Sequence, residues 1–156
     1  MRFEVARIDD EVGAPLIAAL LADLLDRYGM EDTDEPAPVD LAPPRGVFLV
    51  ARGDDGPVGC GGIRDHAEGI AELKRMYVVP TARRRGVARG LLAELERRAV
   101  ALGHSRVRLE TGVRQPEAIE LYQSCGYLPI ERYGHYRASP LSRCFEKSLE
   151  RQGTSV

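Results

Sequence analysis

One strand–helix–strand segment constrains the fold of this chain more than any other part of its sequence. The run IAELKRMYVV at 70–79 is typical of a long strand, and it stops at Pro80. Apolar residues then recur at helical spacing over about 87–102, and Gly103 ends this helix. A further strand, RVRLET, follows at 106–111. A strand, a helix and a strand in direct succession predict a crossover connection within a sheet.

Patterns on both sides of this segment predict the rest of the sheet. Alternating apolar and polar residues at 3–8 indicate a first strand. The other predicted elements are a helix over 11–28 with Asp9 or Asp10 near its N-terminus, strands at 47–52 and 57–64 joined by a GDDG turn, a helix over 116–125, and strands near 127–132 and 143–149. Because antiparallel hairpins come first and the crossover follows, we predict a mixed α/β sheet.

Residues 29–46, here called the acidic loop, separate the first predicted helix from the hairpin. Their sequence, GMEDTDEPAPVDLAPPRG, is rich in acidic residues and proline. Such a composition favours solvent contact and turns over regular structure. We therefore predict a loop or a mobile flap here, not a core element.

Length and composition bound the class of protein. The chain has 156 residues, the size of one domain, which we place at 1–150 with 151–156 as a frayed tail. The formal net charge of −2 gives no overall attraction to nucleic acid or to a membrane surface. No apolar run approaches the roughly 20 residues that a membrane-spanning helix needs.

The three cysteines, Cys60, Cys125 and Cys144, are widely spaced and form no disulfide pattern. No CxxC pair or Cys/His cluster indicates a bound metal. The N-terminus becomes charged at once and shows no apolar leader. These features together predict a cytoplasmic protein without a metal site.

The loop between the 70–79 strand and the next helix has the features of a phosphate site. A helix start offers unpaired N–H groups and a partial positive charge. Gly86 lets a phosphate approach the backbone, Ala88 is small for the same reason, and three consecutive arginines, 83–85, add charge-assisted contacts. The physics favours a pyrophosphate site, and the alternative is a solvated arginine run before an amphipathic helix. No GxxxxGK[ST] or GxGxxG motif offers another phosphate site.

The same residues resemble a known family. The hexapeptide at 83–88, RRRGVA, fits the [Q/R]-x-x-G-x-[G/A] signature of the GNAT superfamily of acyl-CoA N-acyltransferases. The preceding AELKRMYV is similar to that family's fourth strand, and PEAIELYQSCGY resembles its second signature. The resemblance covers residues 3–149. It implies a central, twisted, mostly antiparallel sheet of about six or seven strands, flanked by about three or four helices.

The resemblance also implies where acetyl-CoA would bind. Backbone groups of Met76 and Val78 would pair with the pantetheine arm, much as an added strand pairs with a sheet edge. A bulge near Met76 and Tyr77 would open a wedge for the thioester, and one amide there would polarise its carbonyl. Amides around Arg84 to Arg89 would bind the pyrophosphate. The expected coenzyme-binding residues are Met76, Tyr77, Val78, Arg83, Arg84, Arg85, Gly86, Val87, Ala88 and Arg89.

Two residues are the candidates for catalysis. Tyr122 lies where such enzymes often place a tyrosine near the coenzyme sulfur, which predicts a general acid; its alternative role is a core aromatic on the helix stripe. Glu72, four residues before Met76, is the candidate general base; its alternative role is a surface carboxylate. Glu110 on the neighbouring strand competes with it for the base and is otherwise expected to bind substrate. Burial would raise the pKa of such a carboxylate, which suits a base.

The acceptor side is less defined by the sequence. Tyr133, His135 and Tyr136 form a compact aromatic group that is predicted to line the acceptor pocket, although a structural role is the alternative. The carboxylates of the acidic loop either attract a cationic acceptor or are simply solvated. Many relatives have an asparagine before the second signature helix, whereas this chain has Gln115 and Pro116.

We therefore predict an N-acyltransferase that moves an acetyl or other short acyl group from acyl-CoA to a primary amine by direct attack in a ternary complex. The amine belongs to a small molecule or a protein, and a homodimer is one option. A non-catalytic acyl-CoA-binding regulatory module is the alternative. A nucleic-acid-binding domain that uses the arginine run is disfavoured by the net charge and by the small aromatic content.

Overall fold

The computed structural model describes residues 1–149 of the chain, so the predicted tail at 151–156 lies outside the described residues. Within this range the elements, in chain order, are β1 (Arg2–Ala6), α1 (Gly13–Tyr28), a 3-10 turn η1 (Pro38–Leu41), β2 (Gly46–Gly53), β3 (Gly56–Ala67), β4 (Ile70–Val78), a 3-10 turn η2 (Pro80–Ala82), α2 (Val87–Ala101), β5 (Arg106–Gly112), α3 (Pro116–Ser124), β6 (Leu128–Ile130) and β7 (Ser142–Ser148). None of the helices described is both long and apolar enough to cross a membrane.

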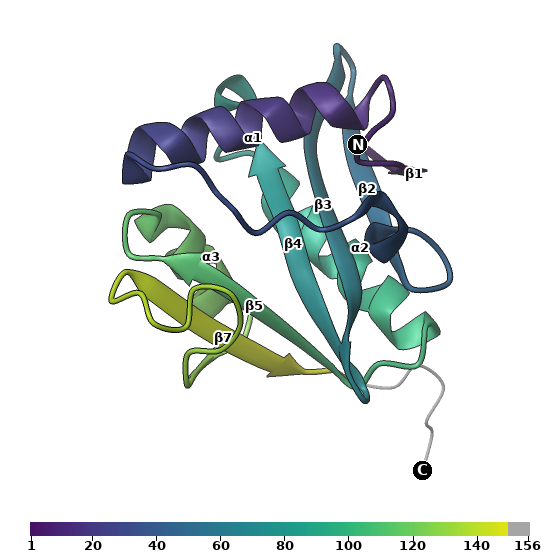
Figure 1. Cartoon of the computed structure of the whole chain (residues 1–156). Coiled ribbons are helices and arrows are strands. Elements are labelled where there is room, and N and C mark those ends of the chain that lie inside the picture. Colours follow the sequence, from purple (N-terminus) through teal and green to yellow (C-terminus); the bar gives the residue numbers. More distant parts are fainter. Residues whose placement is uncertain (150–156) are drawn as a thin grey trace.

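The seven described strands form one sheet in the order β1-β2-β3-β4-β5-β7-β6. All neighbours pair antiparallel except β4 and β5, which the α2 crossover joins in parallel. The predicted mixed α/β class is therefore confirmed. The single parallel pair lies in the middle of the sheet, and α2, the helix of the crossover that joins its two strands, packs on one face (Figure 1).

The helices cover the two faces of the sheet unequally. α2 and α3 pack on one face, where Leu91, Leu95 and Tyr127 belong to the larger buried cluster. α1 lies across the other face with the acidic loop, which crosses in front of β4 and β3 (Figure 1). α1 begins at Gly13, two residues after the predicted start, and the Asp10 carboxylate just before it accepts hydrogen bonds from the amides of Val12 and Gly13.

A β-bulge in β4 sets the geometry of the centre. The β3–β4 register passes from Gly62↔Lys74 to Cys60↔Tyr77, so that Arg75 and Met76 together oppose one residue of β3. Arg75 has a φ of 61°, which breaks the alternation of side chains along the strand. Lys74 and Arg75 consequently both contact the acidic loop, whereas Met76 packs toward α2.

The bulge also separates the two central strands. β4 and β5 pair only from Ile70↔Arg106 to Leu73↔Leu109, and beyond these residues they diverge. Figure 1 shows the two arrows close together at one end and apart at the other. We call this opening the wedge. The edge of β4 from Lys74 to Val78 has no partner strand on the β5 side within residues 1–149.

The prediction for the acidic loop was wrong in one respect. The loop contains the 3-10 turn η1, and Leu41 is only 1% exposed, packed with the Phe48 cluster. Asp32 and Asp34 form ion pairs with β4, and their side chains are mostly buried. The physical reason is the bulge, which directs two adjacent cationic side chains at the loop, a feature that strand periodicity does not reveal.

Candidate active site

The turn before α2 presents its backbone to solvent. Arg84 has a φ of 64° and Gly86 a φ of 79°, so the chain enters the helix through two left-handed residues. No side chain caps the N-terminus of α2, and its first N–H groups therefore remain available. A Cβ atom on Gly86 would meet open space. Successive backbone N–H groups in such a turn form a concave anion site, called a nest.

The arginines around the nest divide into two groups. Arg84 and Arg85 are exposed, so their guanidinium groups are free to contact phosphate oxygens. Arg83 folds back, its Nε donating to the Val78 carbonyl at 3.0 Å, with its guanidinium over the Tyr77 ring. The predicted backbone contact at Val78 is therefore shared with a side chain. Arg89, also exposed, donates to Ser124 and Cys125 and so ties α2 to the end of α3.

A cavity of about 190 Å³ fills the wedge. It reaches from α1 on one face of the sheet, between the diverging strands, to α3 on the other face. Its apolar walls are Leu20, Leu24, Met30, Leu73, Met76, Leu109 and Leu141. Its polar and charged lining includes Tyr28, Glu31, Asp32, Lys74, Arg75, Glu110, Thr111, Gln115, Tyr122, Tyr136, Ser139 and Ser142.

Tyr122 lines this cavity from α3. The residue is 6% exposed, its ring packs edge-on against Tyr127, and its hydroxyl forms no hydrogen bond within residues 1–149. Burial raises the pKa of Tyr122, so the hydroxyl keeps its proton at neutral pH. By contrast, the Tyr127 hydroxyl donates to Glu96. A protonated hydroxyl without a partner, inside a cavity, is able to donate to a bound ligand.

Glu110 lines the same cavity from β5. One of its oxygens accepts a hydrogen bond from Ser142 at 3.0 Å, and no ion pair to Glu110 forms within residues 1–149. Burial raises the pKa of this carboxyl group, and neighbouring carboxylates act in the same direction. The group is thus a carboxylate with a free oxygen and an increased affinity for a proton.

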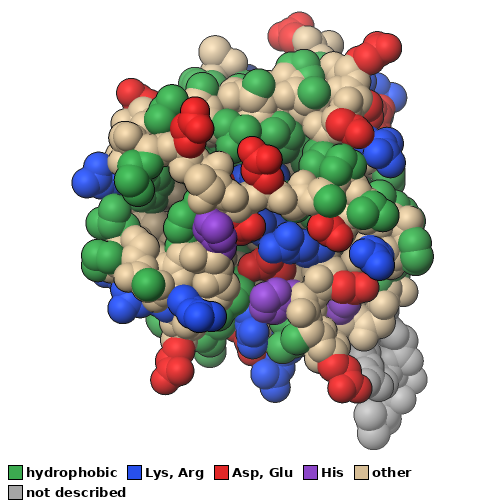
Figure 2. All heavy atoms as spheres, viewed as in Figure 1, with side chains coloured by type: hydrophobic (Ala, Val, Ile, Leu, Met, Phe, Trp, Pro, Cys, Tyr) green, Lys and Arg blue, Asp and Glu red, His purple; other side chains and the backbone are tan. Residues whose placement is uncertain are grey.

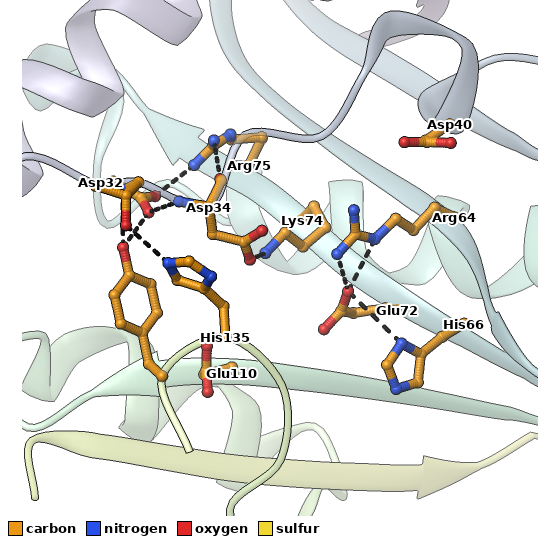
Figure 3. Close-up of polar contacts among 12 residues, drawn as sticks. Asp32, Asp34, Asp40, Arg64, His66, Glu72, Lys74, Arg75, Glu110 and His135 are labelled. Atoms are coloured by element: carbon orange, nitrogen blue, oxygen red, sulfur yellow. Dashed lines mark hydrogen bonds and ion pairs between the residues drawn. The ribbon is translucent and has the colours of Figure 1, made fainter. Parts of the chain in front are cut away.

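Glu72 is placed differently. It is 4% exposed on β4, one oxygen is bound by the Arg64 guanidinium at 2.7 Å, and the other accepts from the Tyr133 hydroxyl at 2.9 Å. His66 approaches the first oxygen at 3.9 Å (Figure 3). Glu72 does not belong to the cavity lining. Both carboxylate oxygens are engaged, which gives Glu72 a clear structural role beside the predicted catalytic one.

Two ion pairs lie at the α1 side of the cavity. Lys74 Nζ contacts Asp34 at 2.5 Å, and Arg75 donates to Asp32 and to the Asp34 carbonyl, each at 2.6 Å (Figure 3). Burial alone would raise the pKa of both aspartates, but hydrogen bonds and the paired cations hold both values below the ordinary range. Figure 2 shows acidic, basic and histidine side chains gathered across the middle of this face.

The predicted aromatic group at 133–136 contacts two separate parts of the protein, Glu72 on β4 and the acidic loop. Tyr133 binds Glu72, with the Arg108 guanidinium over its ring, and does not line the cavity. His135 contacts the Thr33 hydroxyl at 2.7 Å. Tyr136 donates to Asp32 and does line the cavity. Residues 131–141, here called the late loop, are in this way fastened to both β4 and the acidic loop.

Some site residues lie outside the sequence predictions. Lys74 and Arg75 received no role, although two adjacent basic residues on a strand, with an acidic loop elsewhere, form a visible charge pattern. Gln115, the departure from the family pattern, accepts from the Tyr28 hydroxyl and thereby joins α1 to the start of α3. This contact could not be anticipated, because it depends on where α1 ends.

Comparisons with known proteins agree with this geometry. The acetyltransferase (GNAT) family matches residues 17–127. An IAA acetyltransferase of Azospirillum brasilense is 46% identical over 110 residues, which cover 70% of this chain and 72% of the relative. YsnE of Bacillus subtilis, an uncharacterized N-acetyltransferase, is 28% identical over 148 residues, which cover 92% and 98%.

Solved structures show the same arrangement. An acyl-CoA N-acyltransferase from Klebsiella pneumoniae superposes with a TM-score of 0.80 at 33% identity, covering 96% of this chain and 97% of that one. A GNAT acetyltransferase from Elizabethkingia anophelis with acetyl-CoA bound shares the fold, with a TM-score of 0.70 at 14% identity over 95% and 97% of the chains.

Fold and site together define an acyl-group transferase. The chain belongs to the GNAT acetyltransferase family, and it is an acetyltransferase. The predicted family and fold are confirmed. A non-catalytic binding module is not favoured.

Proposed function

We propose that this enzyme transfers the acetyl group of acetyl-CoA directly to the primary amine of a small molecule, with Tyr122 as general acid and Glu110 as general base. The observation that carries the proposal is the Tyr122 hydroxyl, which is protonated and without a partner within residues 1–149, in a cavity that Glu110 also lines. A cytoplasmic location suits the free cysteines. A homodimer stays a prediction.

The coenzyme would bind across the nest and the wedge. The nest at Arg84–Gly86 and the free N–H groups of α2 suit a pyrophosphate, and the exposed Arg84 and Arg85 add charge. The unpaired edge of β4 suits the amide groups of the pantetheine arm. The thioester would then enter the wedge between β4 and β5, close to Tyr122.

The transfer has a complete proton balance. The amine nitrogen forms a bond to the carbonyl carbon, and the carbon–sulfur bond breaks. Tyr122 gives its proton to the leaving sulfur, whose thiol pKa is near 8.5. The ammonium group loses two protons in becoming an amide, and Glu110 accepts them in turn. One proton replaces the proton given by Tyr122, and the other is released to solvent.

Glu110 is preferred to Glu72 as the base for geometric reasons. Glu110 lines the cavity and has a free oxygen, whereas both oxygens of Glu72 are bound and face the Arg64 and Tyr133 side chains. Taking a proton on Glu72 would also weaken its ion pair with Arg64. Glu72 remains the second candidate.

The test is acetyl-CoA-dependent release of CoA in the presence of single acceptors. The acceptors are primary amines and also IAA, because one relative is named for it. We expect turnover with at least one amine, and a decrease in kcat of about 100-fold in Tyr122→Phe with little change in the affinity for acetyl-CoA.

Tyr127→Phe is the matched control. This tyrosine is also buried, but its hydroxyl donates to Glu96 and lies outside the cavity lining. The control is expected to lose stability and to keep its kcat. Equal rates for Tyr122→Phe and the wild type would remove Tyr122 from the chemistry. Transfer to IAA and to no amine would refute the amine acceptor.

A further inference from the structure

The cations that line the cavity are both paired within the protein, whereas two of its carboxylates, Glu31 and Glu110, form no ion pair within residues 1–149. Arg75 and Lys74 are the cationic residues of the lining, and their side chains are only 7% and 12% exposed. Each is held by an aspartate of the acidic loop. A ligand carboxylate that entered the cavity would therefore meet no free cation among the lining residues, and it would face the carboxylates of Glu31, Asp32 and Glu110.

The carboxylate of Glu110 is the opposite case. It forms no ion pair within residues 1–149, so a single ammonium group has a free partner in the cavity. Tyr122 also lines the cavity, its hydroxyl is likewise unpartnered within residues 1–149, and it marks the side of the wedge at which the reacting nitrogen must arrive.

Much of the remaining wall is apolar or aromatic, and its uncharged polar residues are Thr111, Gln115, Ser139 and Ser142. Leu20, Leu24 and Tyr28 come from α1, Leu141 comes from the late loop, and Met30 follows α1. Burying a hydrocarbon or aromatic group against these side chains is favourable, whereas burying a second charge there is costly.

We propose that the acceptors of this enzyme are monocationic amines with an uncharged apolar or aromatic body, and that the Asp32–Arg75 and Asp34–Lys74 pairs exclude amino acids by leaving no cation for an α-carboxylate. The proposal rests on the proposed amine acetylation and deepens it. The two aspartates act as specificity-determining residues, and they take no part in the chemical step.

Three acceptors of similar size test the proposal with the full-length wild-type enzyme. They are phenethylamine, L-phenylalaninamide and L-phenylalanine, and the measurement is kcat/KM from CoA release. We expect phenethylamine and the amide to differ by less than about fivefold, and L-phenylalanine to be poorer than the amide by about 30-fold or more. Rejection of the amide together with the acid would indicate size instead of charge and would overturn the proposal.

Two variants then test the ion pairs themselves. Asp34→Asn frees Lys74, and Asp32→Asn frees Arg75. Each variant is therefore expected to decrease the ratio of kcat/KM for L-phenylalaninamide to kcat/KM for L-phenylalanine by about tenfold. Glu35→Gln, an exposed position on the same loop, changes the net charge equally and is expected to leave the ratio unchanged. Calorimetric binding of acetyl-CoA shows that each variant is folded.

The outcomes separate this proposal from the one on which it rests. Efficient acetylation of L-phenylalanine by the wild type overturns the exclusion of carboxylates and leaves amine acetylation intact. An unchanged ratio in both asparagine variants overturns the role of the ion pairs. No acetylation of any amine contradicts the proposed function itself, and this inference with it.

Discussion

The wedge opens on both faces of the sheet, and we call these two openings its mouths. One mouth is formed by backbone groups and the other by charged side chains. On the α2 side, the nest at Arg84–Gly86 offers backbone N–H groups, and no side chain closes it. On the α1 side, Asp32 and Asp34 meet Arg75 and Lys74 in ion pairs that involve side chains of two distant segments. The first mouth suits a ligand shared by a whole family, because backbone groups do not depend on side-chain identity. The second suits a ligand particular to this chain.

This difference implies that substitutions at the two mouths have separable effects. Changes at the nest are expected to alter the affinity for acetyl-CoA and to leave the order of preference among acceptors unchanged. Changes at the ion pairs are expected to do the reverse. Residues between the mouths, such as Tyr122 and Glu110, are expected to alter the rate of transfer.

The largest effect is expected at the nest. Gly86→Glu places a carboxylate where the pyrophosphate would bind, and we expect the Kd for acetyl-CoA to increase about 100-fold, measured by calorimetry. Gly103→Glu is the matched control. Gly103 follows the other end of α2, also has a positive φ, 94°, and also has open space around its Cβ position. Equal losses of affinity in both variants would mean that backbone strain, and not charge, is responsible.

A second effect is expected between the mouths. Glu110→Gln removes the proposed base, and kcat should decrease by about 30-fold at neutral pH. In the wild type, kcat/KM should decrease as the pH falls through the pKa of Glu110, which burial raises above the ordinary value of a glutamate. The pH–rate profile of the variant should lack this acid limb.

Glu72→Gln is the comparison that can reverse the assignment of Glu110 as the general base. It leaves the Arg64 guanidinium without its ionic partner, so the free energy of unfolding should decrease by about 2 kcal/mol. The pH–rate profile of Glu72→Gln should keep the acid limb of the wild type. An acid limb that disappears in Glu72→Gln and persists in Glu110→Gln would make Glu72 the base.

Glu110→Gln is also expected to change the pH dependence of the free energy of unfolding. Since the folded-state pKa is raised, the folded protein binds the proton more tightly than the unfolded chain does. The free energy of unfolding contributed by this group therefore decreases as the pH rises from the unfolded-state pKa through the folded-state pKa. At pH 8, Glu110→Gln is expected to unfold at a higher temperature than the wild type while being the poorer catalyst.

The smallest effect is expected at Tyr133→Phe. The substitution removes the hydrogen bond to Glu72 but keeps the ring beneath the Arg108 guanidinium. We expect a loss of about 1 kcal/mol in denaturant-induced unfolding and an unchanged Kd for acetyl-CoA. A clear change in that Kd would show that the two mouths communicate through the late loop.

The fold was predictable because its signals are local. The predicted strand at 70–79 corresponds to β4 (Ile70–Val78), and the predicted helix at 87–102 corresponds to α2 (Val87–Ala101). Both have apolar residues at a clear period and a glycine or proline at the end. The nest belongs to the same class of signal, since it depends on Gly86 and on the helix that follows.

The acceptor side was less predictable because its contacts join residues far apart in sequence. The ion pairs depend on the positive φ of Arg75, which no propensity indicates, and on the path of the acidic loop over β4. The difference between Glu72, whose oxygens are both bound, and Glu110, which has a free oxygen in the cavity, depends on where the cavity opens between the strands. Sequence could name both carboxylates as candidates, but it could not rank them.

The wedge exists because β4 has one residue more than its pairing partner β3 at the bulge. Deleting Arg75 would restore a regular two-residue alternation, and β4 could then continue its ladder alongside β5 and close the opening. Substitutions around the opening change what enters it but not whether it exists. The loss of one residue from this strand is therefore expected to affect every acceptor at once, whereas a substitution in the lining is expected to affect the acceptors that contact it.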